Sequence, residues 1–436
     1  MELKPGYKLT EVGMIPNDWS VERMSSLISA PIQNGVFNDP ARKGKGCKLI
    51  NVGDLYNAVP VPSQLLERFD ASKDELSRFG VARGDIFFTR SSLTPDGIAH
   101  CNVYDCSHHE EVVFDCHIVR VRANKKKIEP FYLFRYCKSY SARKYLVTNA
   151  KTTTMTTIDQ AVIANLPTVV PPLAEQRDIA TALHDVDILI SSLDQLIAKK
   201  RDIRQATMQQ LLTGKQRLPG FGRGSVKFKQ TSVGLVPEEW DIKPLGDLGS
   251  WKGGMTPSMK NRLFWANGDI PWASSADVKA TLLVDTQMKV TNVAIKQSAT
   301  TLLPPNSILI VTRSGILRRY LPVAKNTKPM AINQDIKALI PNDDIHADFI
   351  LHVLIGCGHS ILSACLKSGT TVESIEYPWL KAYQIPVPPV SEQIAISTAL
   401  SDMDAELAAL EQKRDKTKAL KQGMMQELLT GRIRLV

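Results

Sequence analysis

Six side chains able to bind a metal ion lie within 17 residues in the first half of the chain. They are Cys101, Cys106, His108, His109, Cys116 and His117. Structural zinc sites usually present their cysteines as Cys-x-x-Cys, and that spacing does not occur here. We therefore expect no bound metal, and zinc is left open only as an alternative.

Two arginines are suited to contact a polyanion. Arg90 and Arg313 each end a hydrophobic run in a Thr-Arg-Ser triplet, at residues 89–91 and 312–314. Arginine can grip a phosphate or pair with a base edge, but it also forms structural salt bridges. Because the triplet occurs twice, we favour phosphate contact or a structural salt bridge over base reading. The sequence leaves these two alternatives open.

Short basic and hydroxyl-rich segments occur at residues 42–45, 151–154, 318–319 and 367–371. Lysine, arginine and threonine side chains on loops suit a phosphate backbone. The alternative for each segment is an ordinary turn or a solvated surface.

Motifs of catalysis are missing from the sequence. It has no Gly-x-x-x-x-Gly-Lys-Ser/Thr loop, no Gly-x-Gly-x-x-Gly, no nucleophile elbow and no Asn/Asp-Pro-Pro-aromatic tetrapeptide of methyltransferases. Glu175 and Glu392 fall where a carboxylate complements the dipole of a helix N-terminus. Asp187 and Asp404 are expected on solvated helix faces. We therefore expect a chain that is not an enzyme.

Composition narrows the class of protein. The chain has 436 residues, a net charge of +10, 43% hydrophobic residues and 22% charged residues, which excludes wholesale disorder. The basic excess lies mainly in residues 1–170 and 218–389. No apolar run approaches the ~18 residues of a membrane span. The seven irregularly spaced cysteines indicate free thiols in a reducing compartment, and no secretory signal is recognisable, so we expect a cytoplasmic protein.

The chain contains an internal repeat. Segments 10–19, 171–187 and 208–218 recur in the same order at 231–240, 388–404 and 425–435. In the second pair, which begins Pro-Pro-x-x-Glu-Gln, 10 of 17 positions are identical. The sequence between the shared segments differs in the two halves, so a duplicated frame carries two different inserts.

The shared segments that begin with Pro-Pro are expected to form long helices over 171–214 and 388–431. Proline is tolerated at a helix start, and the glycine of each Leu-Leu-Thr-Gly suits the position after a helix end. Each helix is expected to span roughly 40 residues, or about 60 Å.

Each long helix carries an apolar seam with alternating spacings of four and three residues. The seam residues are Ile179, Leu183, Val186, Ile190, Leu193 and Ile197 in the first helix, and Ile396, Leu400, Met403, Leu407 and Leu410 in the second. We expect the two helices to pair as an antiparallel coiled coil, with a parallel pair as the alternative. Arg204, Arg414, Thr417 and Lys421 take core positions late in the helices, where we expect the ends to splay or to meet another element.

The inserts are expected to mix strands and helices. Residues 84–90, 306–313 and 112–121 are predicted strands, and 131–145 and 348–367 are predicted helices. The predicted fold class is α+β: two globular α/β domains separated by two long helices that form an antiparallel coiled coil, in a pseudo-twofold internal repeat.

This arrangement closely resembles the specificity (S) subunit of Type I restriction-modification systems. The resemblance covers essentially the whole chain and rests on the paired Val-Gly-x-x-Pro-x-x-Trp openers, Pro-Pro-x-x-Glu-Gln helices and Leu-Leu-Thr-Gly closers. It implies a first target recognition domain at 1–170, a first long helix at 171–214, a linker at 215–230, a second target recognition domain at 231–387 and a second long helix at 388–431.

The resemblance implies a non-catalytic subunit. Each recognition domain would read one half of an asymmetric, bipartite double-stranded DNA target, and the helices would space the two halves. Two modification (M) subunits would dock on the chain and restriction (R) subunits would complete the nuclease. S-adenosylmethionine, ATP and Mg would be bound by those partners and not by this chain.

The candidate DNA-binding residues are Arg42, Lys43, Lys45, Arg90, Ser91, Lys151, Thr152, Thr153, Thr154, Arg313, Ser314, Arg318, Arg319, Lys367, Thr370 and Thr371. Two other readings remain. One is a coiled-coil scaffold whose domains bind proteins, and the other is an enzyme with an unrecognised site in the inserts.

Overall fold

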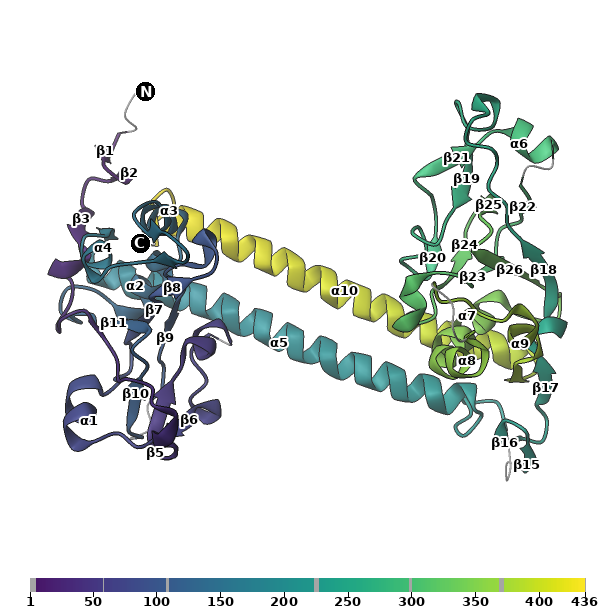
Figure 1. The fold of residues 1–436 in the computed structure, drawn as a ribbon, viewed down its shortest axis with the longest axis horizontal. Helices are drawn as coiled ribbons and strands as arrows, with labels where there is room; N and C mark the ends of the chain where they lie inside the picture. Colours follow the sequence, from purple (N-terminus) through teal and green to yellow (C-terminus); the bar gives the residue numbers. More distant parts are fainter. Residues whose placement is uncertain are drawn as a thin grey trace. The chain divides into compact units, whose positions relative to one another are not determined.

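The chain forms two compact units in the computed structural model (Figure 1). The residues that the structure describes are 5–57, 59–106, 110–222, 227–297, 300–367 and 372–435. The first unit comprises Met1–Asp194 and Gln412–Val436, and the second unit comprises Gln195–Glu411. Each unit therefore holds one insert together with part of each long helix.

The lobe of the first unit is a mixture of short strands and helices. Its strands are β1 (Tyr7–Thr10), β2 (Gly13–Pro16), β3 (Ser20–Arg23), β4 (Gln33–Asn34), β5 (Lys43–Ile50), β6 (Glu67–Phe69), β7 (Ile86–Thr89), β8 (Ser91–Ser92), β9 (Cys101–Val103), β10 (Val112–Phe114), β11 (Ile118–Val121), β12 (Lys151–Thr152), β13 (Thr156–Thr157) and β14 (Pro167–Val170). Its helices are α1 (Lys73–Phe79), α2 (Pro130–Cys137), α3 (Tyr140–Thr148) and α4 (Gln160–Ala164).

Two sheets organise this lobe. One has the strand order β4-β11-β7-β9 and the other the order β10-β5-β6. All four residues of β7 are buried, as a continuous apolar run predicts, and Phe88 packs in one core cluster with Trp19 and Tyr132. Strand β14 pairs with β3 immediately before the first long helix begins.

The lobe of the second unit repeats this plan with different sheets. Its strands are β15 (Phe228–Thr231), β16 (Gly234–Pro237), β17 (Asp241–Pro244), β18 (Gly249–Gly253), β19 (Ile270–Ala273), β20 (Leu282–Leu283), β21 (Met288–Val290), β22 (Leu302–Leu303), β23 (Ile308–Val311), β24 (Val323–Asn326), β25 (Met330–Ile332), β26 (Ile336–Pro341) and β27 (Gln384–Val387). Its helices are α6 (Asn292–Lys296), α7 (Ala347–Gly356), α8 (Gly358–Cys365) and α9 (Tyr377–Ala382). The sheets have the orders β18-β26-β23-β24-β20 and β21-β19-β25-β22, and β17 pairs with β27 as β3 pairs with β14.

Three details of the lobes differ from the sequence-based expectation. The strand predicted over 112–121 is two strands, β10 and β11, which belong to different sheets and are separated by a turn at residues 115–117. The helix predicted over 131–145 is the pair α2 and α3, and the helix predicted over 348–367 is the pair α7 and α8. Apolar periodicity continues across these short breaks, and for that reason the sequence did not reveal them.

The long helices are α5 (Leu173–Leu212) and α10 (Val390–Leu428), of 40 and 39 residues. Each begins directly after its Pro-Pro pair. The glycines of the two Leu-Leu-Thr-Gly closers, Gly214 and Gly431, have φ of 67° and 69°, the left-handed conformation expected after a helix end.

In the first unit the two helices run antiparallel. Asp187 of α5 pairs with Lys421 of α10 at 2.5 Å, and Asp194, further along α5, pairs with Arg414 at 3.5 Å. Rising residue numbers on one helix therefore meet falling numbers on the other. Thr417, which lies between these two basic residues, is buried.

The part of the helix pair in the second unit is antiparallel as well. Lys200 pairs with Glu406 at 2.7 Å, and Arg204 pairs with Asp404 at 2.6 Å. Of the two alternatives expected for the helix ends beyond the polar core positions, the second holds. Arg204, Arg414 and Lys421 reach carboxylates of the other helix, and the last turns of α5 and α10 pack into the core of a lobe. Long polar side chains can occupy a helix interface when each meets an opposite charge.

The predicted seam residues face the interior of their units. The buried ones are Ile179, Leu183, Leu193, Ile197, Ile396, Leu400 and Leu407, and the half-buried ones are Val186, Ile190, Met403 and Leu410. Near the start of each helix, the seam packs into the core of the lobe: Ile179 and Leu183 join the cluster around Trp19, and Ile396 and Leu400 join the cluster around Trp240.

The α+β class, with a mixed lobe in each unit and an antiparallel pair of long helices, is confirmed. None of the seven cysteines, all of which lie within the described residues, forms a disulfide. Among the described residues, no single helix is long and apolar enough to cross a membrane. The consecutive helices α7 and α8 are long and apolar enough only when taken together, and they are bent relative to each other. Most of α7 is buried in the core of the second unit.

Candidate nucleic-acid interface

A buried carboxylate fixes the start of α5 in the first unit. Trp19 Nε1–H donates to Glu175 Oε2 over 3.0 Å. Arg434, which follows the closer of α10, donates from Nε to Glu175 Oε1 (2.6 Å) and from Nη2 to Oε2 (2.7 Å). The same guanidinium pairs with Asp18 at 2.9 Å and lowers the pKa of that carboxyl through this hydrogen bond. The buried charge of Glu175 is therefore fully compensated.

The second unit contains the same arrangement. Trp240 Nε1–H donates to Glu392 Oε2 over 3.0 Å, and Arg217 donates to both oxygens of Glu392 at 2.5 and 2.8 Å. Arg217 follows the closer of α5 and also pairs with Glu239 at 3.1 Å. Burial alone would lower the pKa of Arg217, but its hydrogen bonds to the two glutamates outweigh burial and raise it.

The glutamine of each Glu-Gln pair also holds a helix to its lobe. Gln176 Oε1 accepts from the backbone N–H of Glu129 (2.7 Å), just before α2, and Gln393 Oε1 accepts from that of His346 (2.8 Å), just before α7. Each glutamine also donates to a carbonyl of its own Pro-Pro pair. The motif thus docks a helix onto a lobe, a wider role than the dipole effect expected for its carboxylate alone.

Asp187 and Asp404 are not simply solvated, contrary to the expectation. Besides its contact with α10, Asp187 forms an ion pair with the buried Arg135 of α2. The equivalent place in α7 is taken by His352, which is buried; burial lowers its pKa, and Asp404 opposes that shift only in part. Asp187 therefore links α5 both to α10 and to a short helix of the lobe, whereas Asp404 pairs with Arg204 of α5.

The strand-end arginines lie on the surface at equivalent places. Arg90 follows β7 and Arg313 follows β23, and both side chains are exposed. Among the residues that the structure describes, neither arginine forms an ion pair, so the salt-bridge alternative gains no support there. Backbone hydrogen bonds anchor both: Arg90 N–H donates to His117 O (3.0 Å), and Arg313 N–H donates to Asp335 O (3.2 Å).

Most of the other basic candidates already have an acidic neighbour. The pairs are Arg42 with Glu75, Lys43 with Glu67, Lys45 with Asp70, Lys151 with Asp159, Arg318 with Glu373 and Lys367 with Glu376. Apart from Arg42 with Glu75, such partly exposed pairs contribute little to stability. Arg42 is the most tightly held, because it also donates to Asp70 O and lies over the Phe69 ring.

The remaining candidates lie in short strands and loops of their lobes. Ser91 and Thr152 lie in the small sheet of β12, β13 and β8, and Thr153, Thr154 and Arg319 are exposed. Ser314 Oγ accepts from the backbone N–H of Ile316 (3.5 Å). Thr370 and Thr371 lie outside the described residues. A DNA-binding role for all these side chains stays a prediction.

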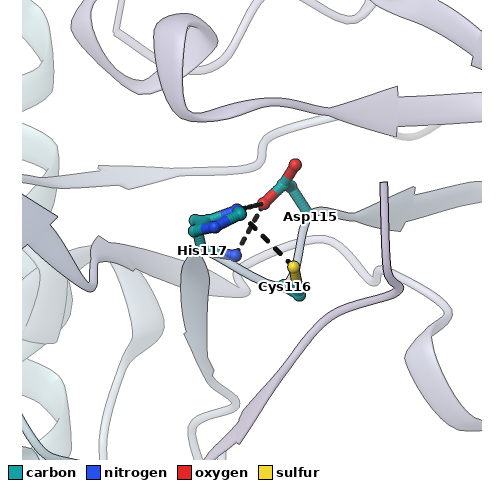
Figure 2. Close-up of side chains that lie close together, drawn as sticks. All are labelled: Asp115, Cys116 and His117. Atoms are coloured by element: carbon teal, nitrogen blue, oxygen red, sulfur yellow. Dashed lines mark hydrogen bonds and ion pairs between the residues drawn. The ribbon is translucent and has the colours of Figure 1, made fainter. Parts of the chain in front are cut away.

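The cysteine- and histidine-rich segment does not come together as one group in the part that the structure describes. Cys101 lies in the core, where burial raises the pKa of its thiol to about 11, and His108 and His109 lie outside the described residues. Figure 2 shows a close set, Cys116 and His117 with Asp115, whose possible ligand atoms lie within 4.8 Å of one another.

Sequence reasoning missed two features of this architecture. It did not pair Arg217 and Arg434 with the glutamates, although both arginines stand three residues after the closer glycine in the repeat. It also missed the turn at residues 115–117, whose counterpart at 333–335 has a different sequence.

Comparison with known proteins agrees with this architecture. A family model described as "Type I restriction modification DNA specificity domain" matches residues 37–199 and 237–419. The EcoR124I/EcoR124II specificity subunit of Escherichia coli is 41% identical over 179 residues, which cover 41% of this chain and 43% of that subunit. The putative MjaX specificity subunit of Methanocaldococcus jannaschii is 25% identical over 434 residues, 98% of this chain and 97% of the relative.

Solved structures show the same fold. The S subunit of a Type I restriction-modification system from M. genitalium superposes with a TM-score of 0.58 at 15% identity, covering 98% of this chain and 99% of that chain. A chain of a solved Type I restriction-modification system gives a TM-score of 0.57 at 17% identity, covering 96% and 99%. With its two matched regions and its duplicated frame, the chain belongs to the family of Type I restriction-modification DNA specificity subunits.

Proposed function

We propose that this chain selects the DNA target of a Type I restriction-modification complex, and that its two lobes read the two halves of an asymmetric, bipartite site. Subunits of this family are non-catalytic, so the chain chooses the sequence and other subunits carry out the reaction.

The proposal rests on one observation: the two units share the same contacts between long helices and lobe, but the lobes themselves differ. The tryptophan–glutamate–arginine contacts, the helix-docking glutamines and the exposed strand-end arginines are the same in both units. The sheets around them differ in strand number and order. Two identical readers would suit a palindrome, whereas two different readers suit an asymmetric site.

The strand-end arginines support a phosphate contact. Arg90 and Arg313 occupy the same place in lobes that otherwise differ, so a sequence-independent contact explains them better than base reading. Each such contact releases counterions and adds about 1 to the slope of log affinity against log salt.

The partners and cofactors follow from the same proposal. Two modification subunits dock on the chain and use S-adenosylmethionine, and restriction subunits use ATP and Mg to cut DNA. The chain itself binds no cofactor, and the complex works in the cytoplasm on double-stranded DNA.

The test is reconstitution. The chain with its modification subunits and S-adenosylmethionine should methylate one bipartite sequence, and neither component alone should do so. Methylation by this chain alone would contradict the proposal, and protein binding without any DNA protection would favour a scaffold instead.

The arginines provide a finer test within the same complex. Arg90→Ala and Arg313→Ala should each lower the salt slope by about 1 and weaken binding to all sequences alike. Arg201→Ala is the matched control, since it removes an exposed positive charge from α5, and it should leave the slope unchanged.

A further inference from the structure

We propose that His117 in the first unit and Asp335 in the second are specificity-determining residues that contact a base edge at equivalent positions of the two half-sites. The inference rests on the proposed function and adds the chemical reason why the two lobes prefer different bases.

The two residues are structural counterparts. His117 immediately precedes β11 and Asp335 immediately precedes β26. Both strands pair antiparallel with the strand that precedes the exposed arginine. His117 O accepts the N–H of Arg90, and Asp335 O accepts the N–H of Arg313. Each candidate reader is therefore fixed beside a candidate phosphate-binding arginine.

His117 and Asp335 each form the tip of a turn, and a buried side chain two residues earlier holds each tip in place. In the first unit, Asp115 Oδ1 accepts from His117 N–H (2.6 Å) and lies 2.8 Å from its Nδ1 (Figure 2). Asp115 Oδ2 accepts from Asn38 Nδ2 (2.7 Å), so the carboxylate cannot rotate freely. Such a buried support positions an exposed side chain at low entropic cost.

The second unit builds the same turn from different residues. Asn333 Oδ1 accepts from Asp335 N–H (3.1 Å), and Asn333 Nδ2 donates to Asp335 Oδ2 (3.0 Å). Asn333 is buried as Asp115 is, and Asp335 is partly exposed. The backbone plan is shared, and the tip changes from imidazole to carboxylate.

The tips differ in hydrogen-bonding character. In the Nδ1–H tautomer that donates to Asp115, Nε2 of His117 is a single acceptor in the plane of the ring, which suits an exocyclic amino group such as adenine N6. Asp335 retains Oδ1, which accepts no hydrogen bond from any residue in the described part of the chain. A carboxylate oxygen accepts from an exocyclic amino group, as on cytosine. Equivalent positions in the two lobes thus offer a single ring nitrogen to one half-site and a negatively charged carboxylate oxygen to the other.

Polar side chains surround both tips. Asn34 Nδ2 donates to Cys116 O (2.8 Å), and Gln160 Nε2 donates to Asn34 Oδ1 (2.6 Å). In the second unit Thr256 Oγ1 donates to Gln334 Oε1 (2.5 Å). Amide groups of this kind are common readers of base edges, so each tip lies on a surface suited to DNA.

A metal site is the competing explanation for the first turn. Cys116 Sγ lies 3.5 Å from His117 Nδ1, and both are near the Asp115 carboxylate. The second turn, however, offers Asn333, Gln334 and Asp335, without a thiol or an imidazole. The feature that the two units share is the fixed tip, and a metal would explain only one of them.

The experiment exchanges the tips in the complete complex. Asp115→Asn with His117→Asp gives the first turn the supporting and tip residues of the second, and Asn333→Asp with Asp335→His does the reverse. Each double variant, assembled with modification subunits, is tested on a DNA library randomised over both half-sites, and the methylated sequences are read.

Each exchange should change the preferred base at one position of one half-site by about 10-fold and leave the other half-site unchanged. The unchanged half-site shows that the complex has assembled, and His117→Ala should lose preference at that position without gaining a new one. Arg90→Ala should instead weaken methylation of all sequences alike.

Two results would overturn the inference. One is an unaltered methylated sequence in both exchanges, while the wild-type complex remains sequence-specific. The other is one zinc per wild-type chain that disappears in His117→Ala. If the wild-type complex shows no site-specific methylation, the proposed function itself fails, so the two failures are distinguishable.

Discussion

Replacing Arg217 by leucine should destabilise the second unit strongly. The guanidinium is 7% exposed and its partner Glu392 is 1% exposed, so Arg217→Leu leaves a carboxylate in the core with only the indole N–H of Trp240. Breaking a buried ion pair by removing one partner costs about 3–5 kcal/mol. Arg434→Leu should cost less, since Arg434 is 25% exposed and water can reach the site.

Urea unfolding followed by circular dichroism measures the free energy of unfolding, and hydrogen exchange of β17 and β27 assigns the loss to the second unit. Adding Glu392→Gln to Arg217→Leu should recover part of the stability, because the amide removes the stranded charge and still accepts from Trp240. Arg201→Leu is the matched control. Its pair with Glu411 is exposed, so its loss should cost at most about 1 kcal/mol.

The reasoning is refuted if Arg217→Leu lies within about 0.5 kcal/mol of the wild type, the range of ordinary surface substitutions. It is also refuted if the double variant is no more stable than the single one, because the cost would then come from lost packing and not from an unpaired charge.

Two further predictions concern local structure. Arg42 lowers the pKa of Glu75 from the ordinary 4.5 to about 2. Glu75 therefore stabilises the fold above about pH 4.5, and this contribution is lost as the pH falls towards 2. Arg42→Met should move the midpoint of acid unfolding, measured by circular dichroism, to higher pH, and an unchanged midpoint would contradict the pairing. Gly431→Ala should be more destabilising than Gly13→Ala by about 1–3 kcal/mol in urea unfolding. Both glycines have positive φ, but a Cβ at Gly431 would lie 2.4 Å from Pro16 Cδ, whereas one at Gly13 meets open space. If the two substitutions lower the free energy of unfolding equally, the backbone conformation alone matters.

Local patterns in the sequence were sufficient to predict the two long helices and the internal repeat. Apolar spacing revealed both long helices, and the Pro-Pro pairs and the closer glycines marked their ends to within a few residues. The repeat itself indicated a duplicated unit, and the antiparallel pairing expected from it is present in each unit. These features depend on residues close together in the chain, where periodicity and conformational preference act directly.

The lobes were predicted less well. Seven of the ten residues at 112–121 are apolar, and the sequence indicated one strand where the structure has two strands in different sheets. The hydrogen bond from His117 N–H to Asp115 is local, but the contact of Asp115 with Asn38 joins segments 77 residues apart, which local patterns do not indicate.

The sequence by itself determined the repeat, the two helices, the divergent inserts and the family. Only the tertiary structure decided which charged groups meet. Arg434 meets Glu175 across 259 positions of the chain. Most of the basic candidates pair with nearby acids, whereas Arg90 and Arg313 pair with none of the acids that the structure describes. The physical reason is that helix ends and strand periodicity are set by short-range preferences, whereas the partner of a charge is set by how distant segments pack.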